Sequence, residues 1–400
     1  MSPLHRIWRA LPAGPRRAAL ARVTALIAPR PDRQPPPVVG GIGIVGEFSR
    51  ASGLGGIVRL LHAGCGQLGV PSWAVDLSGR PGPRVALPDA LPPGAPLLIA
   101  VNAPHLPIAL LRLGRAALRG RRIIGYWAWE LPSLPPDWWQ GAPFVHEVWT
   151  LSDFSAAALE PLAPGRVRRV RLCLAAVPPV ASGLDRAAFG LPAQAVVTLV
   201  SFNLASSRAR KNPEAAIAAH RAAFGDRADR ILLLKIGNPG DFPEDFAALR
   251  DLAAASPNIR IFTDTLPEAD AHALTRAADI VLSLHRSEGF GLVPAEAMLL
   301  GRPVVATGWS GNLDFMDADS AALVPCRLVP ARDPRGVFEA PGAVWAEPDI
   351  GAAAAWLRRL ADDPALRAEL GARGQALATA RLGTDDLRAA VCALGLACAS

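Results

Sequence analysis

Short apolar segments alternate with helical patterns along most of this 400-residue chain, and this alternation limits the folds that the chain can adopt. Short apolar runs are typical of strands buried on both faces of a parallel sheet, and strands separated by helices form parallel βαβ units. The predicted strands are 38–45, 96–101, 122–126, 147–151, 196–202, 231–236, 259–262, 280–284 and 303–306. We therefore predict an α/β protein with doubly wound parallel sheets.

The predicted strands fall into two series, which suggests two large domains. The first series lies in residues 38–178 and the second in residues 190–375, and the proline-containing segment between them is interpreted as a linker. Residues 1–37 form a basic arm that ends in three prolines, and residues 376–400 form a helical tail.

The positive charge of the chain is concentrated at its start. The formal net charge is +7, and residues 1–37 contain seven arginines and one acidic residue, Asp32, for a net +6. The rest is nearly neutral, whereas a nucleic-acid-binding protein is basic across its folded part, so we expect no nucleic acid as a partner. The basic arm is interpreted either as a contact to an anionic membrane surface or as a solvated, disordered extension.

Cysteine usage and hydropathy favour a cytoplasmic protein, at the inner face of the membrane if the arm docks there. None of the five cysteines has a partner at metal-ligand or redox spacing. No apolar run reaches the ~18 residues of a spanning helix. Arginines interrupt the first segment where a signal peptide needs an apolar core.

The segment from Ser287 to Met298 combines two carboxylates with a glycine-rich turn. Glu288 and Glu296 lie eight residues apart, and the turn between them leads into a helix predicted to begin near Pro294. The N–H groups of such a turn and the helix N-terminus favour a diphosphate. The carboxylates can accept hydrogen bonds from hydroxyls on either side of it. A molecule with hydroxyls on both sides of a diphosphate is a nucleotide sugar.

Basic side chains are expected to reach the same place, because open parallel sheets bind ligands at the carboxyl ends of their strands. They follow the predicted strand 196–202 and belong to Arg208, Arg210 and Lys211. The turn adds backbone N–H groups from Gly289, Phe290, Gly291 and Leu292. Together they would stabilise the charge that develops on a departing nucleoside diphosphate. No Asp-x-Asp pair is placed to hold a divalent ion, so we predict a metal-independent mechanism without a cofactor.

These features also have ordinary structural interpretations. Glu288 and Glu296 are each typical of an acid at a helix start, and a basic run is more often a solvated surface segment. His285 is more often a core or loop histidine than a catalyst. Asn212 is predicted to cap the next helix, which Gly225 ends. The functional interpretation depends on strand, loop and helix occurring together in the correct order.

The chain resembles the retaining glycosyltransferases of family 4, which have the GT-B architecture of two facing Rossmann-like domains with a cleft between them. The segment from Glu288 to Glu296 resembles the Glu-x7-Glu motif of that family, in which seven residues separate two glutamates. The other similar stretches are 53–55, 101–105, 127–132, 148–152, 210–213, 279–292, 301–307 and 310–312. The resemblance runs from about Val38 to the tail.

The resemblance implies a role for each matching position in the second domain. Glu288 would contact the donor sugar and Glu296 the ribose, while Lys211 and Arg210 would bind the diphosphate, with Arg208 as a further candidate. Retention of configuration would follow a front-face route, in which the leaving phosphate deprotonates the acceptor.

The first domain would supply the remaining contacts. Gly53 and Gly55 would let its first loop approach the donor, although a tight turn explains glycines equally well. His105, at the end of a predicted strand, and Glu130 are candidates for acceptor or sugar contacts. The nearby tryptophans are expected to pack under a loop in at least two of four cases, with a sugar-stacking platform as the alternative. They are Trp127, Trp129, Trp138 and Trp139.

We therefore expect an enzyme that moves a hexose from a nucleoside-diphosphate sugar to a hydroxyl of a glycan or lipid-linked acceptor. Two alternatives stay open: a sugar-nucleotide epimerase of the same architecture, and a non-catalytic GT-B subunit that only binds.

Overall fold

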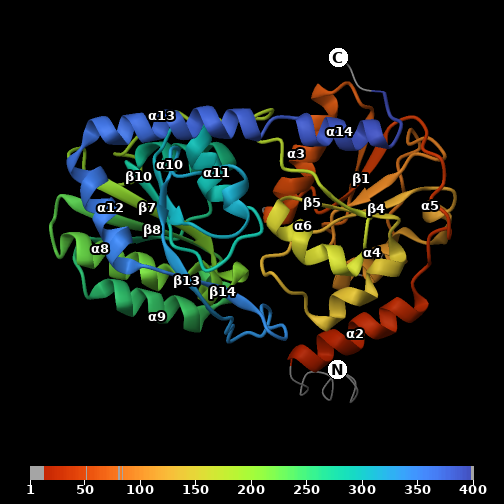
Figure 1. Cartoon of the computed structure of the whole chain (residues 1–400), viewed down its shortest axis with the longest axis horizontal. Helices are drawn as coiled ribbons and strands as arrows, with labels where there is room; N and C mark the ends of the chain where they lie inside the picture. The colour runs from red at the N-terminus through yellow and green to blue at the C-terminus, as the bar shows by residue number, and fades with distance from the viewer. Residues whose placement is uncertain (1–12, 51, 80–81, 83, 398–400) are drawn as a thin grey trace. The chain divides into compact units, whose positions relative to one another are not determined.

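The chain is divided into two compact units (Figure 1). The computed structural model describes residues 13–50, 52–79, 82 and 84–397. Unit 1 comprises Met1–Ala176 together with Thr384–Ser400, and unit 2 comprises Val177–Gly383. Each unit contains one six-stranded sheet of parallel strands, so the predicted fold class is confirmed.

The sheet of unit 1 has the strand order β2-β1-β3-β4-β5-β6. Its strands are β1 (Ile42–Gly46), β2 (Ser72–Asp76), β3 (Leu97–Ile99), β4 (Ile123–Tyr126), β5 (Glu147–Thr150) and β6 (Val167–Arg169). The helices are α2 (Ala13–Ile27), α3 (Gly53–Gln67), α4 (Leu106–Leu113), α5 (Arg115–Leu118), α6 (Asp153–Leu159) and α14 (Asp385–Ala393). β1 pairs with both β2 and β3, so the winding reverses between β1 and β3. At such a point, an open sheet leaves a crevice outside its carboxyl edge.

The sheet of unit 2 has the order β12-β11-β10-β7-β8-β9. Its strands are β7 (Val196–Asn203), β8 (Arg230–Gly237), β9 (Ile259–Phe262), β10 (Ile280–Ser283), β11 (Val304–Thr307) and β12 (Ala322–Val324). The helices are α7 (Arg208–Lys211), α8 (Pro213–Phe224), α9 (Pro243–Ala254), α10 (Glu268–Ala277), α11 (Leu292–Leu299), α12 (Ile350–Asp362) and α13 (Pro364–Arg381). The winding reverses between β7 and β10, which pair directly.

Apolar side chains on both faces of the second sheet explain why its strands are visible in the sequence. One cluster joins the strands to α8, α9 and α12, and another joins them to α10. β9 has the predicted bounds, and β7, β8, β10 and β11 lie within one residue of them at each end. The edge strands β2, β6 and β12 and the antiparallel pair β13 (Cys326–Pro330) and β14 (Val344–Pro348) were not predicted. β2 and β13 expose side chains along their length, so they lack a continuous apolar run.

The C-terminal tail differs from its prediction. The expected boundary at residue 375 falls inside α13, and the following helix α14 belongs to unit 1. There Asp386 accepts hydrogen bonds from Arg171 at 2.8 Å and from Arg169 at 3.2 Å. Burial opposes the charge of Asp386, but the hydrogen bond and charge of Arg171 prevail and lower its pKa.

The described part of the basic arm packs on unit 1. Helix α2 contacts α4 and the short 3-10 helix η2 (Pro136–Gln140). Asp32 accepts a hydrogen bond from the Gly120 N–H at 2.8 Å, and its carbonyl oxygen lies 2.9 Å from a ring nitrogen of His146. A solvated, disordered extension therefore does not describe residues 13–37, and residues 1–12 lie outside the described part of the chain.

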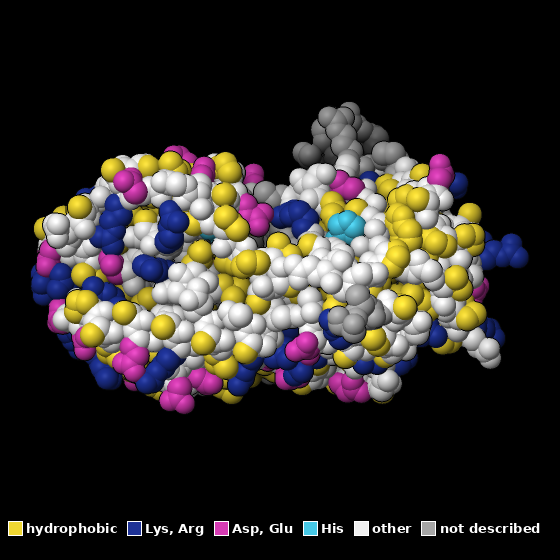
Figure 2. Space-filling model, turned by 90° about the horizontal axis from the view of Figure 1, so that it is seen from above, with side chains coloured by type: hydrophobic (Ala, Val, Ile, Leu, Met, Phe, Trp, Pro, Cys, Tyr) yellow, Lys and Arg dark blue, Asp and Glu magenta, His cyan; other side chains and the backbone are white. Residues whose placement is uncertain are grey.

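The surface agrees with the charge distribution expected from the sequence. On the face shown in Figure 2, basic and acidic side chains are interspersed.

Of the described cysteines, Cys65 and Cys173 are buried and Cys392 is exposed, and none is in a disulfide. Within the described ranges, no helix combines the length and the apolar character needed to cross a bilayer.

Candidate active site

The candidate site of unit 2 lies at the carboxyl edge of its sheet, where the winding reverses. The loop after β7 carries α7, and the loop after β10 carries Glu288 and leads into α11. Because β7 and β10 are neighbours, both loops leave the sheet side by side. The strand order therefore explains why residues about 80 positions apart in the chain meet at one site.

Helix α7 is a single turn held in place by polar side chains on both of its sides. Ser207, with a φ of 69°, precedes it and accepts a hydrogen bond from the Arg210 N–H at 3.3 Å. The Ser207 hydroxyl in turn donates to the buried Asp333 at 2.8 Å. Neither Ser207 nor Asp333 was singled out by the sequence pattern, because each acts through the backbone of a neighbouring segment.

Asn212 ends α7 and occupies the N-cap position of the next helix as predicted, but its side chain does not cap that helix. Its backbone is left-handed, with φ 51°, and its side chain makes no capping hydrogen bond to α8. Instead, Nδ2 donates to the carbonyl oxygen of Leu284 at 3.1 Å. The Asn212 side chain thus bonds to a buried carbonyl just after β10 and not to the first N–H groups of α8. This contact fixes the end of α7 beside β10. The predicted end of α8 at Gly225 is confirmed.

Glu288 forms a buried cluster with the two cations that the sequence singled out. Its Oε2 lies 3.1 Å from Arg210 Nη1, and its Oε1 contacts Lys211 Nζ. Burial opposes the charge on Glu288, but Lys211 and then Arg210 outweigh that effect and lower the pKa of Glu288 to about 2. Glu288 is therefore an ionised carboxylate at neutral pH, held in an environment with little water.

The two cations differ in exposure. The Arg210 side chain is 3% exposed, donates to the Ser287 carbonyl at 2.7 Å and lies over the ring of Phe338, 4.9 Å from its centroid. The Lys211 side chain is 19% exposed. Arg210 thus holds the carboxylate from inside the protein, whereas Lys211 reaches the surface of the site.

The backbone around Glu288 is fixed by the loop after β11. The Glu288 N–H donates to the Ser310 hydroxyl at 2.9 Å, and the Gly311 N–H donates to the Glu288 carbonyl at 2.9 Å. A Cβ on Gly311 would lie 2.1 Å from the Gly289 carbonyl oxygen, so only glycine permits this approach. Ser310 has a φ of 82°, which is unusual outside glycine. In the sequence, Ser310 and Gly311 stood out only as part of a stretch that resembles a known family, and their role in holding the Glu288 backbone was not predicted.

His285 has the structural role that is usual for a buried histidine. Its ring nitrogens lie 3.0 Å from the Ser283 hydroxyl and 3.1 Å from the Asn312 side-chain oxygen. Burial lowers the pKa of His285, so the ring is neutral at physiological pH. It joins the end of β10 to the loop after β11.

Unpaired backbone N–H groups lie at the start of α11. This helix begins at Leu292, two residues earlier than predicted, after Gly291 with φ 99°. Among the described residues, none accepts a hydrogen bond from the N–H groups of Phe290, Gly291 or Leu292. The Phe290 ring is buried and packs on Phe315, with 4.9 Å between ring centroids. Unsatisfied N–H groups at a helix start make a site for an anion.

Glu296 and Arg208 lie next to this cluster and have other partners. Glu296, on α11, is 4.0 Å from Nε2 of His272. Burial disfavours the charged form of His272, but the hydrogen bond and charge of Glu296 prevail and raise its pKa. Arg208 contacts Glu214 and lies 3.6 Å from Asp245. No contact between Arg208 and Glu288 is present in the described part of the chain.

The candidate residues of unit 1 lie in segments that follow strands at the carboxyl edge of its sheet. Gly53 begins α3, and Gly55 donates its N–H to the Ser52 hydroxyl at 3.1 Å. A Cβ on Gly55 would lie 2.2 Å from the Arg50 carbonyl oxygen, so a close turn requires this glycine. The loop leaves β1 beside β3, where the winding reverses.

His105 and Glu130 follow two neighbouring strands of the same sheet. His105 does not end a strand as predicted: β3 ends at Ile99, and His105 is the last residue of the 3-10 helix η1 (Ala103–His105). It is exposed, and Glu130 is partly buried after β4. The strand ends before the predicted residue because Pro104 favours the start of a helical turn, and η1 continues directly into α4.

Three of the four tryptophans near Glu130 are buried. Trp127, Trp129 and Trp138 are at most 4% exposed, and the rings of the last two lie 5.0 Å apart. Trp139 is 51% exposed. The prediction that at least two of these residues pack under a loop is confirmed.

Comparison with known proteins agrees with the fold of two parallel sheets. HepE of Anabaena, whose structure contains UDP and glucose, superimposes with a TM-score of 0.60 at 13% identity over 89% of this chain and 99% of its own. Sucrose-phosphate synthase of Thermosynechococcus elongatus gives a TM-score of 0.61 at 17% identity over 89% and 98%. The chain has the GT-B fold. Residues 203–345 match the family described as Glycosyl transferases group 1, and this range contains the Glu288 cluster.

Sequence relatives match part of the GT-B chain. A D-inositol 3-phosphate glycosyltransferase of Saccharomonospora viridis is 32% identical over 174 residues, which are 42% of this chain and 38% of the relative. An enzyme of the same description from Corynebacterium glutamicum is 34% identical over 105 residues, a quarter of each chain. The chain thus spans well under half the length of the curated relatives that it matches.

Proposed function

We propose that this protein is a retaining, metal-independent glycosyltransferase that moves a hexose from a nucleoside-diphosphate sugar to a hydroxyl of a glycan or lipid-linked acceptor. The observation that carries the proposal is the Glu288 cluster. An ionised, buried carboxylate contacts two cations and lies one short turn from N–H groups that have no acceptor among the described residues. Hydroxyl-binding and diphosphate-binding groups are thereby combined at one edge of one sheet.

The comparisons support the same class of reaction. The family match covers the segment that contains the cluster. HepE, which shares the fold, was crystallised with UDP and glucose, and the relative from S. viridis is described as a glycosyltransferase. A nucleotide sugar is the donor that this combination favours.

In the proposed reaction, the donor diphosphate occupies the start of α11. The bond between the sugar C1 and the diphosphate oxygen breaks, and the acceptor oxygen forms a bond to C1 on the same face. The acceptor proton passes to the departing phosphate oxygen. The N–H groups of Phe290, Gly291 and Leu292 and the ammonium of Lys211 stabilise the charge that develops on the diphosphate.

Glu288 and its partners have distinct tasks in this proposal. Glu288 accepts hydrogen bonds from donor-sugar hydroxyls, because its low pKa keeps both oxygens as acceptors. Arg210 holds that carboxylate in place and keeps it charged. Lys211 is the more exposed cation, and its ammonium donates to a phosphate oxygen. Glu296, 30% exposed on α11, binds the ribose.

The remaining candidates complete the substrate contacts. Gly53 and Gly55 permit close approach of a backbone loop to the donor. His105 and Glu130 contact the acceptor or the transferred sugar. Arg208 adds positive charge near the diphosphate, where Glu214 and Asp245 orient its side chain.

Donor screening and product analysis test the proposal. The thermal midpoint of the protein is measured with UDP-, GDP- and ADP-sugars, because a ligand that binds the folded state raises it. Transfer is then measured for Lys211→Ala and for the control Arg250→Ala, an exposed residue of α9. We expect Lys211→Ala to lose about 10²–10³-fold in transfer rate, with the control unchanged.

Three results would contradict the proposal. Full transfer by Lys211→Ala would remove the cation from the reaction, and conversion of nucleotide sugars without an acceptor would assign the protein to the epimerases. Donor binding without turnover across a panel of acceptors would favour a non-catalytic subunit.

A further inference from the structure

Helix α2 presents large apolar side chains to solvent and small side chains to the protein. Its inner face, at most 8% exposed, consists of Ala21 and Thr24, with Ala28 directly after the helix. Its outer face carries Leu20, Val23, Leu26 and Ile27, which are 42%, 56%, 84% and 65% exposed. A surface helix of a globular protein normally has the opposite arrangement. The outer face is therefore rich in large aliphatic side chains, as is typical of a surface that contacts lipid or another apolar partner.

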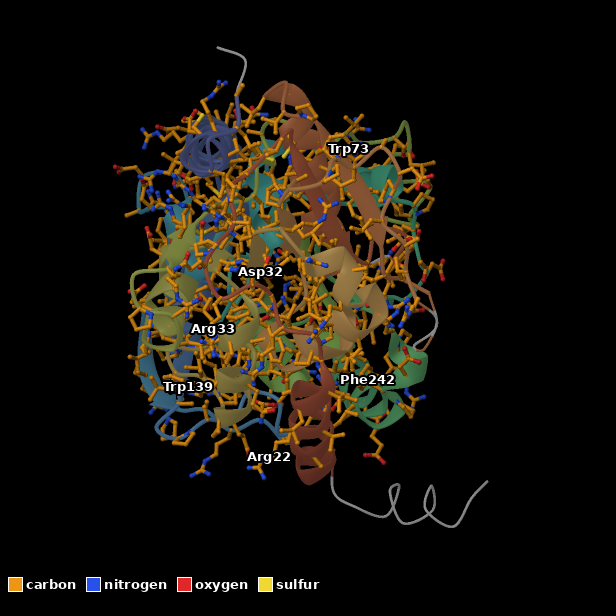
Figure 3. All side chains as sticks on the ribbon, turned by 90° about the vertical axis from the view of Figure 1, so that its right-hand side faces the viewer. Arg22, Asp32, Arg33, Trp73, Trp139 and Phe242 are labelled. Atoms are coloured by element: carbon orange, nitrogen blue, oxygen red, sulfur yellow. The ribbon has the colours of Figure 1, made fainter. Side chains whose placement is uncertain are left out.

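An exposed tryptophan extends this apolar face. Trp139 is 51% exposed and belongs to η2, which contacts α2. Figure 3 shows Trp139 and Arg22 at the end of unit 1 where α2 lies. Tryptophan is enriched where a protein meets the boundary between lipid and water. Arg22, Arg30 and Arg33 are exposed in the same segment.

A cavity of about 500 Å³ opens beside the end of α2. Three arginines line it, namely Arg30, Arg84 and Arg115, together with the apolar side chains of Leu26, Ile27 and Leu111. None of the described residues that line it is acidic. Within the described ranges, none of the three guanidinium groups forms an ion pair with a carboxylate. Arg30 also lies over the Phe144 ring, 5.9 Å from its centroid. Guanidinium groups without a carboxylate partner around a hollow suit a phosphate, which arginine binds through paired N–H groups.

The cavity is separate from the candidate residues of unit 1. Helix α4 begins directly after His105 and ends at Leu113, and Gly114 lines the cavity. The eight residues of α4 place its two ends about 12 Å apart. The cavity thus lies at the far end of α4 from the carboxyl edge of the sheet, and a role in sugar transfer does not explain it.

We propose that the outer face of α2, Trp139 and the arginine-lined cavity form a docking surface for an anionic phospholipid membrane. The apolar side chains of α2 enter the boundary between headgroups and acyl chains, and the cavity receives a lipid phosphate. Apolar side chains next to unpaired arginines match this boundary, where both kinds of contact are made together. Nucleic acid would leave Leu26 and Ile27 unexplained. The inference goes beyond the proposed function and does not depend on it.

Vesicle binding by the full chain tests the docking surface. Flotation is measured with vesicles of phosphatidylcholine alone and of equal parts phosphatidylcholine and phosphatidylglycerol, without nucleotide sugar. Three double variants are compared with the unmodified protein. They are Leu26→Ser with Ile27→Ser, Arg84→Glu with Arg115→Glu, and the control Arg250→Glu with Arg373→Glu, two exposed arginines of unit 2.

We expect the unmodified protein and the control to bind the anionic vesicles and to bind neutral vesicles at least tenfold more weakly. Either of the other variants should lose about tenfold or more in binding, since each removes two groups that contact the membrane. Far-UV circular dichroism and thermal midpoints verify folding. If the double variant Leu26→Ser with Ile27→Ser does not fold, the glutamate variant, Arg84→Glu with Arg115→Glu, tests the proposal by itself, because it is altered only at exposed positions.

Equal binding by the glutamate variant and the unmodified protein would overturn the proposal, and so would a failure of the unmodified protein to bind anionic vesicles. The alternative is that a second copy of this chain covers the outer face of α2. Light scattering without vesicles tests it: a dimer that the double variant Leu26→Ser with Ile27→Ser converts to a monomer would assign the face to that second copy.

Discussion

The Nη1 atom of Arg210 lies 3.1 Å from the Oε2 atom of Glu288, and neither side chain is more than 10% exposed. The two residues belong to loops after neighbouring strands and are brought together by the reversal of winding in the second sheet. Lys211 completes the cluster. Removing the carboxylate leaves two uncompensated positive charges in a site from which water is largely excluded.

Replacing Glu288 by Gln should therefore affect both stability and activity. The variant leaves Arg210 and Lys211 without their carboxylate, and we expect the free energy of unfolding to fall by about 3 kcal/mol. Lys211→Ala leaves the Arg210 contact intact and should cost about 1 kcal/mol or less. Urea unfolding at neutral pH measures both values, and equal losses for the two variants would contradict this difference.

The stabilisation from Glu288 should depend on pH in a defined window. Because the folded pKa of about 2 lies below the ordinary value of 4.5, the contribution is present above about pH 4.5. It is lost as the pH falls towards 2, because the unfolded state takes up the proton first. The difference in unfolding free energy between the unmodified protein and Glu288→Gln should shrink across that window. A difference that stays constant from neutral pH to pH 2 would show that Glu288 is not held ionised.

His272 should report on Glu296. The pKa of His272 is raised by Glu296 despite burial, so Glu296→Gln should lower it. The stabilisation from this pair is present below the ordinary histidine pKa of 6.5 and is lost as the pH rises through the higher folded pKa. NMR titration of the His272 ring checks the shift. An unchanged pKa in the variant would mean that the 4.0 Å contact carries no electrostatic coupling.

Two adjacent glycines of α3 should respond in opposite ways to alanine. At Gly55, a Cβ would lie 2.2 Å from the Arg50 carbonyl oxygen, whereas a Cβ at Gly56 would meet no described atom within 4 Å apart from its chain neighbours and its own helix backbone. Gly55→Ala should displace the loop and lower the free energy of unfolding by about 1–3 kcal/mol. Gly56→Ala should raise it by roughly 0.5–1 kcal/mol, because alanine favours the helix. Thermal unfolding of both variants compares them, and similar midpoints would refute the packing argument.

Much of this architecture was accessible from local sequence patterns. The central strands of the second sheet are short apolar runs because both of their faces are buried, so their positions follow from residue type. Glycine ends α8 at residue 225, because a left-handed position there favours it. The charged residues Glu288, Arg210 and Lys211 were recognisable because they follow strands, and parallel strands bring their carboxyl ends to one edge.

Other features were decided by contacts between distant segments. The Asn212 amide bonds the Leu284 carbonyl and not its own helix, and Asp386 joins the last helix to Arg171 across more than 200 residues of chain. The exposed apolar face of α2 is likewise invisible until the packing of its small side chains is known. The sequence by itself determined which segments are strands and helices and which residues carry charge, because these depend on neighbours along the chain. Only the tertiary structure decided which partner each polar group takes, because competing donors and acceptors come from segments whose proximity no local pattern records.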